Sequence, residues 1–282
     1  MPTIELELTA PADATLSAVP QRNGQFRPPL KWAGGKTHLV PRLNLLYADH
    51  RHRRLIEPFV GGLAVSLGLV PSCALLNDVN PHLVNFYRQL QNGLRIDLDM
   101  QNDSEKFYEA RTRFNELLQA GRQNTQEAAS LFYYLNRTCF NGLCRFNSKG
   151  SYNVPFGKYK TINYTRDFTS YQPLLARWEF RLGDFATIPT EPDDFIYADP
   201  PYDVEFTKYS ADDFKWNDQI RLAEWLAAHP GPVVASNQAT DRIIALYEGL
   251  GFQVETLPAP RRISCNGDRS DALEILALKN IT

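Results

Sequence analysis

Residues 199–202, Asp-Pro-Pro-Tyr, combine an acid, two stiff residues and an aromatic ring. They follow an apolar run at 195–198 that is typical of a buried strand. Proline has a fixed φ, and the residue before it is held extended, so the carbonyls here are rigidly placed. The Asp199 carboxylate and the Pro200 carbonyl can therefore accept both hydrogens of one amino group, while Tyr202 stacks on the ring that carries it. Such an arrangement would turn the lone pair of an aromatic amine toward an electrophile. A strand-ending turn with an Asp cap is the alternative.

A glycine turn, Gly61-Gly62, lies between a predicted strand at 54–60 and an apolar, helix-compatible segment. Glycine lets the backbone turn sharply there and approach a ligand closely. The next predicted strand, 73–76, leads to Asp78, at the place where nucleotide-binding α/β folds hold a ribose diol with an acid. The full Gly-x-Gly-x-x-Gly pattern is absent, so a tight turn without a ligand is the alternative.

Glu57, beside this turn, favours a cationic ligand over a dinucleotide, because its carboxylate would repel a pyrophosphate. S-adenosylmethionine carries a sulfonium, an ammonium and a ribose diol suited to Asp78. A second acid and aromatic, Asp184 and Phe185, follow a predicted strand at 179–182 and could hold and cover an adenine ring.

The loop at 30–36, Leu-Lys-Trp-Ala-Gly-Gly-Lys, sets two lysines around a tryptophan and a flexible glycine pair. Trp32 could pack on a ligand, and Lys36 could meet a carboxylate. A loop with a surface tryptophan is the other interpretation.

The elements that must position these residues alternate between strand and helix in two stretches of the chain. Besides the strands above, strands are predicted at 194–198, 232–236, 252–257 and 272–278, and helices at 81–90, 218–228 and 241–250. Residues 104–138 have a helical pattern, whereas 139–165 have none. We therefore expect an α/β domain at 25–85 and 166–282, an insertion at 86–165, and a loosely ordered leader at 1–24.

Composition bounds the class of protein. The 282 residues are 43% hydrophobic and 22% charged, as in ordinary soluble globular chains. The sequence contains no apolar run long enough to cross a membrane and no signal-peptide pattern at its start. The four cysteines form no Cys-x-x-Cys pair, so we predict no metal site, reduced thiols and a cytoplasmic location.

The net charge of −2 argues by itself against a nucleic-acid partner, but basic residues are clustered locally. From Arg137 to Arg181 there are eight lysines or arginines and two acids. Two smaller clusters are Arg51, Arg53 and Arg54, and Arg261, Arg262 and Arg269. Such patches can bind phosphates whatever the total charge, although a solvated face is the simpler interpretation of any one of them.

The order of the motifs over residues 28–278 resembles the Dam-type DNA adenine methyltransferases, which act on the adenine amino group in GATC. The matching segments are Lys-Trp-Ala-Gly-Gly-Lys (31–36), Glu-Pro-Phe-Val-Gly (57–61), Asn-Asp-Val-Asn (77–80), Leu-Asn-Arg-Thr-Cys-Phe-Asn-Gly-Leu-Cys-Arg-Phe-Asn (135–147), Asn-Val-Pro-Phe-Gly-Lys-Tyr (153–159), Asp-Pro-Pro-Tyr (199–202) and Ser-Asn (236–237).

The resemblance implies a Rossmann-like S-adenosylmethionine-dependent methyltransferase sheet with an inserted helical and β-hairpin DNA-recognition domain. It implies a monomer that acts on double-stranded DNA by base flipping and direct in-line transfer. The implied catalytic residues are Asp199, Pro200 and Tyr202. The expected cofactor-binding residues are Trp32, Ala33, Gly34, Lys36, Glu57, Phe59, Gly61, Asp78, Asp184, Phe185 and Asp199. The expected DNA-binding residues are Lys31, Arg137, Phe140, Asn141, Leu143, Arg145, Asn147, Pro155 and Tyr159.

The sequence departs from the family pattern in two places. The family's Phe-x-Gly-x-Gly pattern lacks its last glycine, because Leu63 stands there. Phe140 and Phe146 stand where tyrosines are common, which keeps the stacking but removes a hydroxyl. These changes leave the sequence preference less constrained than the activity.

Alternative functions share parts of the pattern. A methyltransferase acting on RNA or on a protein glutamine would have the same fold, but the loop at 135–159 and the acid at 199 argue against them. A non-catalytic DNA-binding module would not require the intact 199–202 motif, and a nicotinamide-dependent dehydrogenase would leave it unexplained. The sequence does not decide between restriction protection, mismatch repair and regulation.

Overall fold

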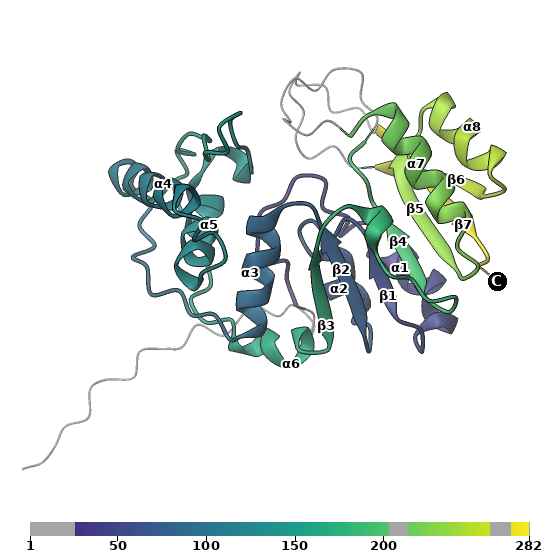
Figure 1. Cartoon of the computed structure of the whole chain (residues 1–282), viewed down its shortest axis with the longest axis horizontal. Coiled ribbons are helices and arrows are strands. Elements are labelled where there is room, and N and C mark those ends of the chain that lie inside the picture. The colour runs from purple at the N-terminus through teal and green to yellow at the C-terminus, as the bar shows by residue number, and fades with distance from the viewer. Residues whose placement is uncertain (1–25, 203–213, 260–271, 282) are drawn as a thin grey trace, which may run out of the picture.

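A computed structural model describes residues 26–202, 214–259 and 272–281 of the chain (Figure 1). Within these residues, seven strands form one sheet in the order β3-β2-β1-β4-β5-β7-β6. The strands are β1 (Leu55–Glu57), β2 (Ala74–Asp78), β3 (Trp178–Leu182), β4 (Phe195–Ala198), β5 (Val233–Gln238), β6 (Gln253–Ala259) and β7 (Ala272–Lys279). The first five are parallel, and β7 runs antiparallel to β5 and β6. The predicted α/β sheet is confirmed. The predicted leader and the cluster Arg261, Arg262 and Arg269 lie outside the described residues.

The helices alternate with these strands. The α-helices are α1 (Val40–Leu46), α2 (Ala64–Leu69), α3 (Pro81–Gln91), α4 (Ser104–Gln119), α5 (Gln126–Thr138), α6 (Gln172–Leu175), α7 (Trp216–Ala227) and α8 (Asp241–Gly249), and the 3₁₀ turns are η1 (Ala48–His50), η2 (Phe140–Gly142), η3 (Thr169–Tyr171) and η4 (Phe185–Thr187). Several begin at side-chain caps: Asn80 accepts two backbone N–H bonds at the start of α3, and Asp103, Thr125 and Thr240 cap α4, α5 and α8. Helix α1 has no such cap, and the sequence did not predict it.

Alternate residues of the central strands face two separate cores, because successive side chains of a strand point to opposite sides. Leu55 and Phe195 pack in the core that includes α1, α2 and α3. Ile56 and Ile196 pack in the second core, with α7 and α8. Helices therefore cover both faces of the sheet, as a parallel sheet requires.

The strand order places a crossover between β1 and β4. Both strands pair directly, yet β2 and β3 extend the sheet from β1 while β5, β7 and β6 extend it from β4. Ligands of open α/β sheets bind at such a switch point, outside the carboxyl ends of the strands. The residues that follow β1, β2 and β4 are therefore brought to one edge of the sheet.

The insertion leaves and rejoins the sheet domain at one place. The N–H of Ile96 donates to the Arg166 carbonyl (2.8 Å), and the N–H of Phe168 donates to the Leu94 carbonyl (3.3 Å). Figure 1 shows α4 and α5 on the far side of α3 from the sheet. The predicted start at residue 86 falls inside α3, which continues to Gln91 and contacts both β3 and α5. These two hydrogen bonds join the backbone on either side of residues 97–165, which lie within the predicted insertion at 86–165.

The turn after β1 depends on unusual backbone angles. Gly61 has φ 46° and Leu63 has φ 65°, so both lie in the left-handed region. Leu63 is fully buried and occupies the position where the resembling family has its last glycine. A left-handed conformation costs an L-residue about 1–2 kcal/mol, which burial of the leucine side chain offsets. Gly61 and Gly62 both pack against Trp32.

Replacing Gly61 by alanine should destabilise the protein more than replacing Gly121, although both glycines have positive φ. A Cβ on Gly61 would lie 2.9 Å from Nε1 of Trp32, whereas nothing lies within 4 Å of a Cβ on Gly121. We expect Gly121→Ala to cost about 1 kcal/mol from the backbone alone. Gly61→Ala should cost about 1–3 kcal/mol more through overpacking. Urea unfolding measures both; equal losses would show that Trp32 does not constrain the turn.

Candidate active site

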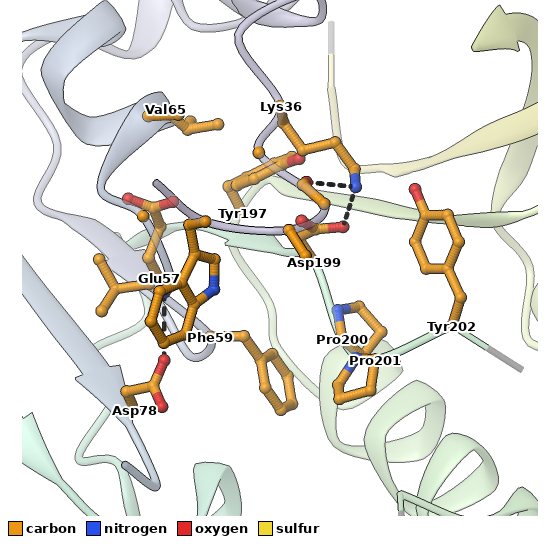
Figure 2. Close-up of a pocket in the computed structure, with 18 of the residues that line it drawn as sticks. Lys36, Glu57, Phe59, Val65, Asp78, Tyr197, Asp199, Pro200, Pro201 and Tyr202 are labelled. Atoms are coloured by element: carbon orange, nitrogen blue, oxygen red, sulfur yellow. Dashed lines mark hydrogen bonds and ion pairs between the residues drawn. The ribbon is translucent and has the colours of Figure 1, made fainter. Parts of the chain in front are cut away.

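A cavity of about 500 Å³ opens at the carboxyl ends of β1, β2 and β4, a size typical of small-molecule sites. Figure 2 shows Lys36, Asp199 and Tyr202 on one side and Glu57, Phe59 and Asp78 on the other. The lining residues come from three parts of the sequence: 32–36, 57–79 and 197–202. The strand crossover thus assembles segments that are far apart in the chain.

Asp199 is held at one of its two carboxylate oxygens. Its Oδ1 lies 3.1 Å from Nζ of Lys36 and accepts a hydrogen bond from Oγ of Ser236 (2.8 Å). Lys36 also donates to the Gly34 carbonyl (2.9 Å), and Ser236 is hydrogen-bonded to the Tyr197 hydroxyl (2.9 Å). Burial raises the pKa of Asp199, while Lys36 and Ser236 oppose the shift. The ammonium beside the carboxylate therefore favours its ionised form.

Two hydrogen-bond acceptors of the cavity-lining residues have no donor among the described residues. One is Oδ2 of Asp199, and the other is the backbone carbonyl of Pro200. The next carbonyl, that of Pro201, is already engaged by Nε2 of Gln219 (2.8 Å), and Asn237 holds the Gln219 side chain (2.9 Å). Hydrogen bonds to neighbouring residues thus fix the 199–202 segment on both sides of the two acceptors. Together these acceptors can bind both hydrogens of one amino group.

Tyr202, the last residue of the 199–202 motif, has a neutral hydroxyl. Its hydroxyl donates to Oε2 of Glu274 (2.7 Å), and Nζ of Lys36 lies 4.5 Å from the centre of its ring. Burial raises the pKa of Tyr202, and the negative charges of Asp199 and Glu274 raise it further. The ring is therefore an uncharged surface on which a flat ligand can stack.

Glu57 lies in the cavity wall at the end of β1 and is 3% exposed. It accepts a hydrogen bond from Oγ of Ser66. Burial raises its pKa to about 8, and the nearby Asp199 contributes in the same direction. A buried acid with so high a pKa is stabilised in its ionised form by a cationic ligand.

Asp78, at the end of β2, orders the neighbouring backbone. Its Oδ2 accepts the N–H of Gly61 (3.1 Å), and its Oδ1 accepts the N–H of Asn80 (2.9 Å). Burial raises its pKa, and these backbone donors oppose the shift. The preceding residue, Asn77, donates to the carbonyls of Pro58 and Gly183 (3.0 and 2.9 Å) and so joins the ends of three strands.

Most of the predicted cofactor-binding residues line the cavity, but two do not. Those that line it are Trp32, Ala33, Gly34, Lys36, Glu57, Phe59, Gly61, Asp78 and Asp199. Asp184 instead pairs through both oxygens with Arg221 (3.0 and 2.8 Å), which lowers its pKa. Phe185 is 3% exposed and packs behind Phe59, with ring centres 5.7 Å apart. Phe185 thus supports the wall rather than covering the cavity directly.

The cavity fits S-adenosylmethionine. Carboxylates of Glu57, Asp78 and Asp199 lie in its wall, and Lys36, the one cation among the described lining residues, is engaged by Asp199. Such a wall suits a ligand with positive charge and a diol. Trp32 and Phe59 supply apolar surface for the remainder of the molecule.

Lys31 and Tyr159, two predicted DNA-binding residues, contact each other. Nζ of Lys31 lies 3.6 Å from the centre of the Tyr159 ring and donates to the Arg137 carbonyl (3.0 Å). The side chain of Asn136 holds both the N–H and the carbonyl of Lys31 at 2.8 Å. Burial and the charge of Arg137 lower the pKa of Lys31. The cavity loop is therefore fixed to the end of α5.

The other predicted DNA-binding residues lie on and beside a small hairpin. Phe140 is 48% exposed and Leu143 is 37% exposed, and Pro155 is also exposed. Arg145 donates to the side-chain oxygen of Asn153 (2.8 Å), which holds its guanidinium along the hairpin. These residues form a mixed apolar and basic surface.

Two asparagines shape this hairpin. Asn147 accepts the N–H groups of Lys149 and Ser151 (both 3.0 Å) and so closes the turn between the bridged residues Phe146 and Tyr152. Asn141 has φ 53°, a left-handed conformation that asparagine tolerates better than most residues. Both residues were predicted to contact DNA; in the free protein the Asn147 side chain holds the turn, and Asn141 supplies a left-handed backbone conformation.

The basic cluster at 51–54 has a structural role. Arg53 and Arg54 pair with Asp193 and Asp194 (2.9 and 2.7 Å), at the opposite ends of β1 and β4 from the cavity. In the part of the chain that the structure describes, no His, Cys, Asp and Glu side chains gather in a metal-binding group, and no helix is long and apolar enough to span a membrane.

Sequence reasoning missed Gln219, Glu274 and Ser66. Glu274 in β7 and Ser66 in α2 are polar residues in otherwise apolar stretches, and Gln219 lies on the buried face of α7 with Leu222, Ala223 and Leu226. Buried polar side chains need partners, so a polar residue on the apolar face of an element is the signal that could have identified them. It would not have named the partners, which come from distant parts of the sequence.

Comparison with known proteins gives the family. The sequence pattern of the D12 class N6 adenine-specific DNA methyltransferases matches residues 32–261. The chain is 33% identical over 293 residues to the type II methyltransferase M.MjaIII of Methanocaldococcus jannaschii, covering 91% of this chain and 99% of that one. It is 35% identical to a DNA adenine methylase of Vibrio cholerae, covering 88% and 94%. It is 37% identical to the DNA N-6-adenine-methyltransferase of Escherichia phage P1, covering 88% of this chain but only 35% of that longer protein.

Among solved structures, a putative RNA methyltransferase from Pyrococcus horikoshii aligns over 88% of this chain and 84% of its own, with a TM-score of 0.41 and 7% identity. That likeness is too distant to bear on function.

The pKa of Glu57 predicts a pH-dependent stability. The pKa is about 8 in the folded chain against an ordinary value of 4.5, so the stabilising contribution of the group is complete below pH 4.5 and is lost as the pH rises through 8. Glu57→Gln cannot ionise, so its free energy of unfolding should rise relative to the unmodified protein by up to about 1.4 kcal/mol per pH unit in this window. Urea unfolding at pH 5.5, 6.5 and 7.5 measures the difference.

The same series on Glu255→Gln is the control, because Glu255 pairs with Arg42 outside the cavity. A constant difference between Glu57→Gln and the unmodified protein across the three pH values would contradict the prediction.

Proposed function

The chain belongs to the D12 class N6 adenine-specific DNA methyltransferases, and from that premise we propose that it methylates the adenine of GATC in double-stranded DNA after flipping that base out of the helix. Membership makes it an enzyme that transfers a methyl group from S-adenosylmethionine to N6 of adenine in DNA. The observation that carries the proposed mechanism is the pair of free acceptors, Oδ2 of Asp199 and the Pro200 carbonyl, beside the Tyr202 ring.

Base flipping follows from the position of these acceptors. They lie in the wall of a cavity, and the Asp199 side chain is only 19% exposed. A stacked and paired adenine presents its amino group inside the duplex, where such recessed groups cannot reach it. The target base must therefore leave the stack, and we propose that Tyr202 receives it by stacking.

The residues of the chain then prepare the amine. Asp199 and the Pro200 carbonyl each accept one hydrogen of the N6 amino group, which withdraws its lone pair from the purine ring and aims it into the cavity. Lys36 and Ser236 keep the Asp199 carboxylate ionised and fixed. S-adenosylmethionine supplies the electrophilic methyl group on its sulfonium when bound. No covalent bond to a cysteine is required.

We assign the cofactor to the acidic and aromatic wall. Trp32 and Phe59 would pack on it, with Ala33, Gly34 and Gly61 allowing close approach. Glu57 would face positive charge, and Asp78 would hold the ribose diol with the lone pairs that its two backbone donors leave open. Phe185 would act through Phe59, and Asp184 would act only if its pair with Arg221 opened.

Recognition of the DNA sequence is assigned to the hairpin of the insertion, which would act as the target-recognition domain. Arg145 presents donors for a guanine edge, while Leu143 and Pro155 offer apolar contact to a thymine methyl. The exposed Phe140 is suited to wedge into the stack left by the flipped base. GATC itself comes from the motif resemblance. We propose that the chain acts as a monomer and that Lys31, Arg137 and Tyr159 anchor the cavity loop beside the DNA.

Replacing Asp199 by alanine should lower the single-turnover rate of methyl transfer by at least about 10²-fold, the magnitude for removing one preorganised active-site group. Binding to DNA should stay within about twofold, because phosphate contacts dominate affinity. Asp193→Ala is the matched control, since that carboxylate is 94% exposed and pairs only with Arg53. Retained turnover in Asp199→Ala would overturn the mechanism.

Two hairpin substitutions should separate base reading from phosphate binding. Arg145→Ala should cost about 1–3 kcal/mol at one base pair of the site and broaden the set of methylated sequences. Lys149→Ala, at the exposed hairpin tip, should weaken binding to all sequences alike and reduce the salt dependence by about one phosphate contact. Mapping methylated adenines in genomic DNA measures the effect of Arg145→Ala, and DNA binding at several salt concentrations measures that of Lys149→Ala. An unchanged site in Arg145→Ala would exclude it as a base-reading residue.

A further inference from the structure

Glu274 is a buried acid that has no assigned part in the reaction. It is 2% exposed and lies in β7, opposite Gln238 of β5. Because β7 runs antiparallel, its first residues lie at the same edge of the sheet as the carboxyl end of β5. Glu274 therefore reaches the cavity edge from a strand that contributes no residue to the cavity lining among those described.

Both carboxylate oxygens of Glu274 are used. Oε2 accepts the hydroxyl hydrogen of Tyr202 (2.7 Å), and Oε1 is paired with Nε2 of His38. His38 lies two residues beyond Lys36, in the loop that leads to α1, and its side chain is 23% exposed. Three distant segments, the loop at 36–38, the end of β4 and the start of β7, thus converge on one tyrosine.

A role in stability alone does not account for this arrangement. Removing a carboxylate from water costs several kcal/mol, and an apolar residue of similar volume usually packs at least as well. An apolar side chain at 274 would also suit the strand, whose neighbours Ile275 and Leu276 are fully buried. The acid contributes what an apolar residue cannot, a fixed acceptor for the Tyr202 hydroxyl.

The hydrogen bond from the Tyr202 hydroxyl to Glu274 is the contact that sets the orientation of the Tyr202 ring. The Pro200-Pro201 segment fixes the backbone before it, with the Pro201 carbonyl held by Gln219. Nζ of Lys36 lies over the ring at 4.5 Å, a contact that tolerates rotation about the Cβ–Cγ bond. Among the described residues, the directional partner of the Tyr202 side chain is Glu274, which accepts its hydroxyl hydrogen.

We propose that Glu274, itself oriented by His38, is a positioning residue that holds the Tyr202 ring ready to receive the target adenine. The inference rests on the proposed role of Tyr202 as the stacking platform. Glu274 touches neither base nor cofactor in this assignment. It acts by keeping the ring in one orientation before the base arrives, so that stacking and alignment of the amine occur together.

A double-mutant cycle tests this directly. Tyr202→Phe keeps the ring but removes the hydroxyl, and Glu274→Ala removes its acceptor. Each should lower the single-turnover rate about tenfold, the effect of losing a hydrogen bond to a charged group, with little change in the affinity for DNA. The double variant should be no slower than either single variant, because both changes break the same bond. Losses that multiply to about a hundredfold would overturn the proposal.

Two further variants keep the test informative if Glu274→Ala unfolds. Glu274→Gln retains an oxygen that can accept a hydrogen bond from the tyrosine hydroxyl. With Tyr202 present it should therefore transfer methyl groups faster than Glu274→Ala, and in the Tyr202→Phe protein the two variants should have the same rate. His38→Ala keeps the Glu274 carboxylate but removes the partner that orients it. It should slow methyl transfer severalfold in the protein with Tyr202 and have no effect on the rate of Tyr202→Phe. Equal effects of either change in both backgrounds would contradict a role through Tyr202.

The control is Glu255→Ala on β6, whose carboxylate pairs with Arg42 and leaves the cavity untouched. It should transfer methyl groups at the unmodified rate, with a small loss of thermal stability because the pair is partly exposed. The cycle is independent of the Asp199 experiment: turnover in Asp199→Ala would overturn the proposed chemistry, whereas a multiplicative cycle would overturn only the positioning of Tyr202.

Discussion

The ion pair between Lys36 and Asp199 is the contact on which the arrangement of the site depends. It joins the loop before α1 to the end of β4, and the same loop carries Trp32 against the glycine turn after β1. Asp199 shares the cavity with Glu57 and Asp78, and burial raises the pKa of all three acids. Without the Lys36 ammonium, Asp199 would lose the positive charge that opposes this shift. The lysine opposes the effect of burial on the pKa of Asp199 and so favours its ionised form, whereas backbone N–H donors do so at Asp78 and the Ser66 hydroxyl does so at Glu57.

A second constraint is the attachment of the insertion to the cavity. The side chain of Asn136 at the end of α5 holds the backbone of Lys31, next to Trp32. On the other side, Asn80, which follows the cavity acid Asp78, donates to Sγ of Cys144 in the hairpin (3.3 Å). The cavity wall and the hairpin of the insertion are thus joined by direct contacts of Asn136 and Asn80.

The sequence predicted the parts of the molecule that local patterns encode. Apolar runs ended by Gly, Pro or Asp marked nearly every strand, because a buried strand and its turn are both local. The motif at 199–202 predicted binding of an aromatic amino group because its acid, prolines and tyrosine are adjacent in the sequence. The ion pairs between distant residues could not be predicted from local patterns. Asp184 was predicted to bind the cofactor, but both of its carboxylate oxygens pair with Arg221, which is distant in the sequence. Glu274 was missed because its partners His38 and Tyr202 lie 236 and 72 residues away in the sequence, and the antiparallel pairing of β7 brings it to them.

Leu63 clarifies what the glycine pattern in the turn requires. The last glycine of the family pattern is replaced by a leucine that keeps the left-handed conformation, with φ 65°. Its side chain is fully buried and is absent from the cavity lining, whereas Gly61 and Gly62 line the cavity and press against Trp32. Positions 61 and 62 therefore need glycine in this chain, because a larger residue would meet Trp32. Position 63 needs only the backbone angle, and a leucine can supply it where burial of its side chain outweighs the strain.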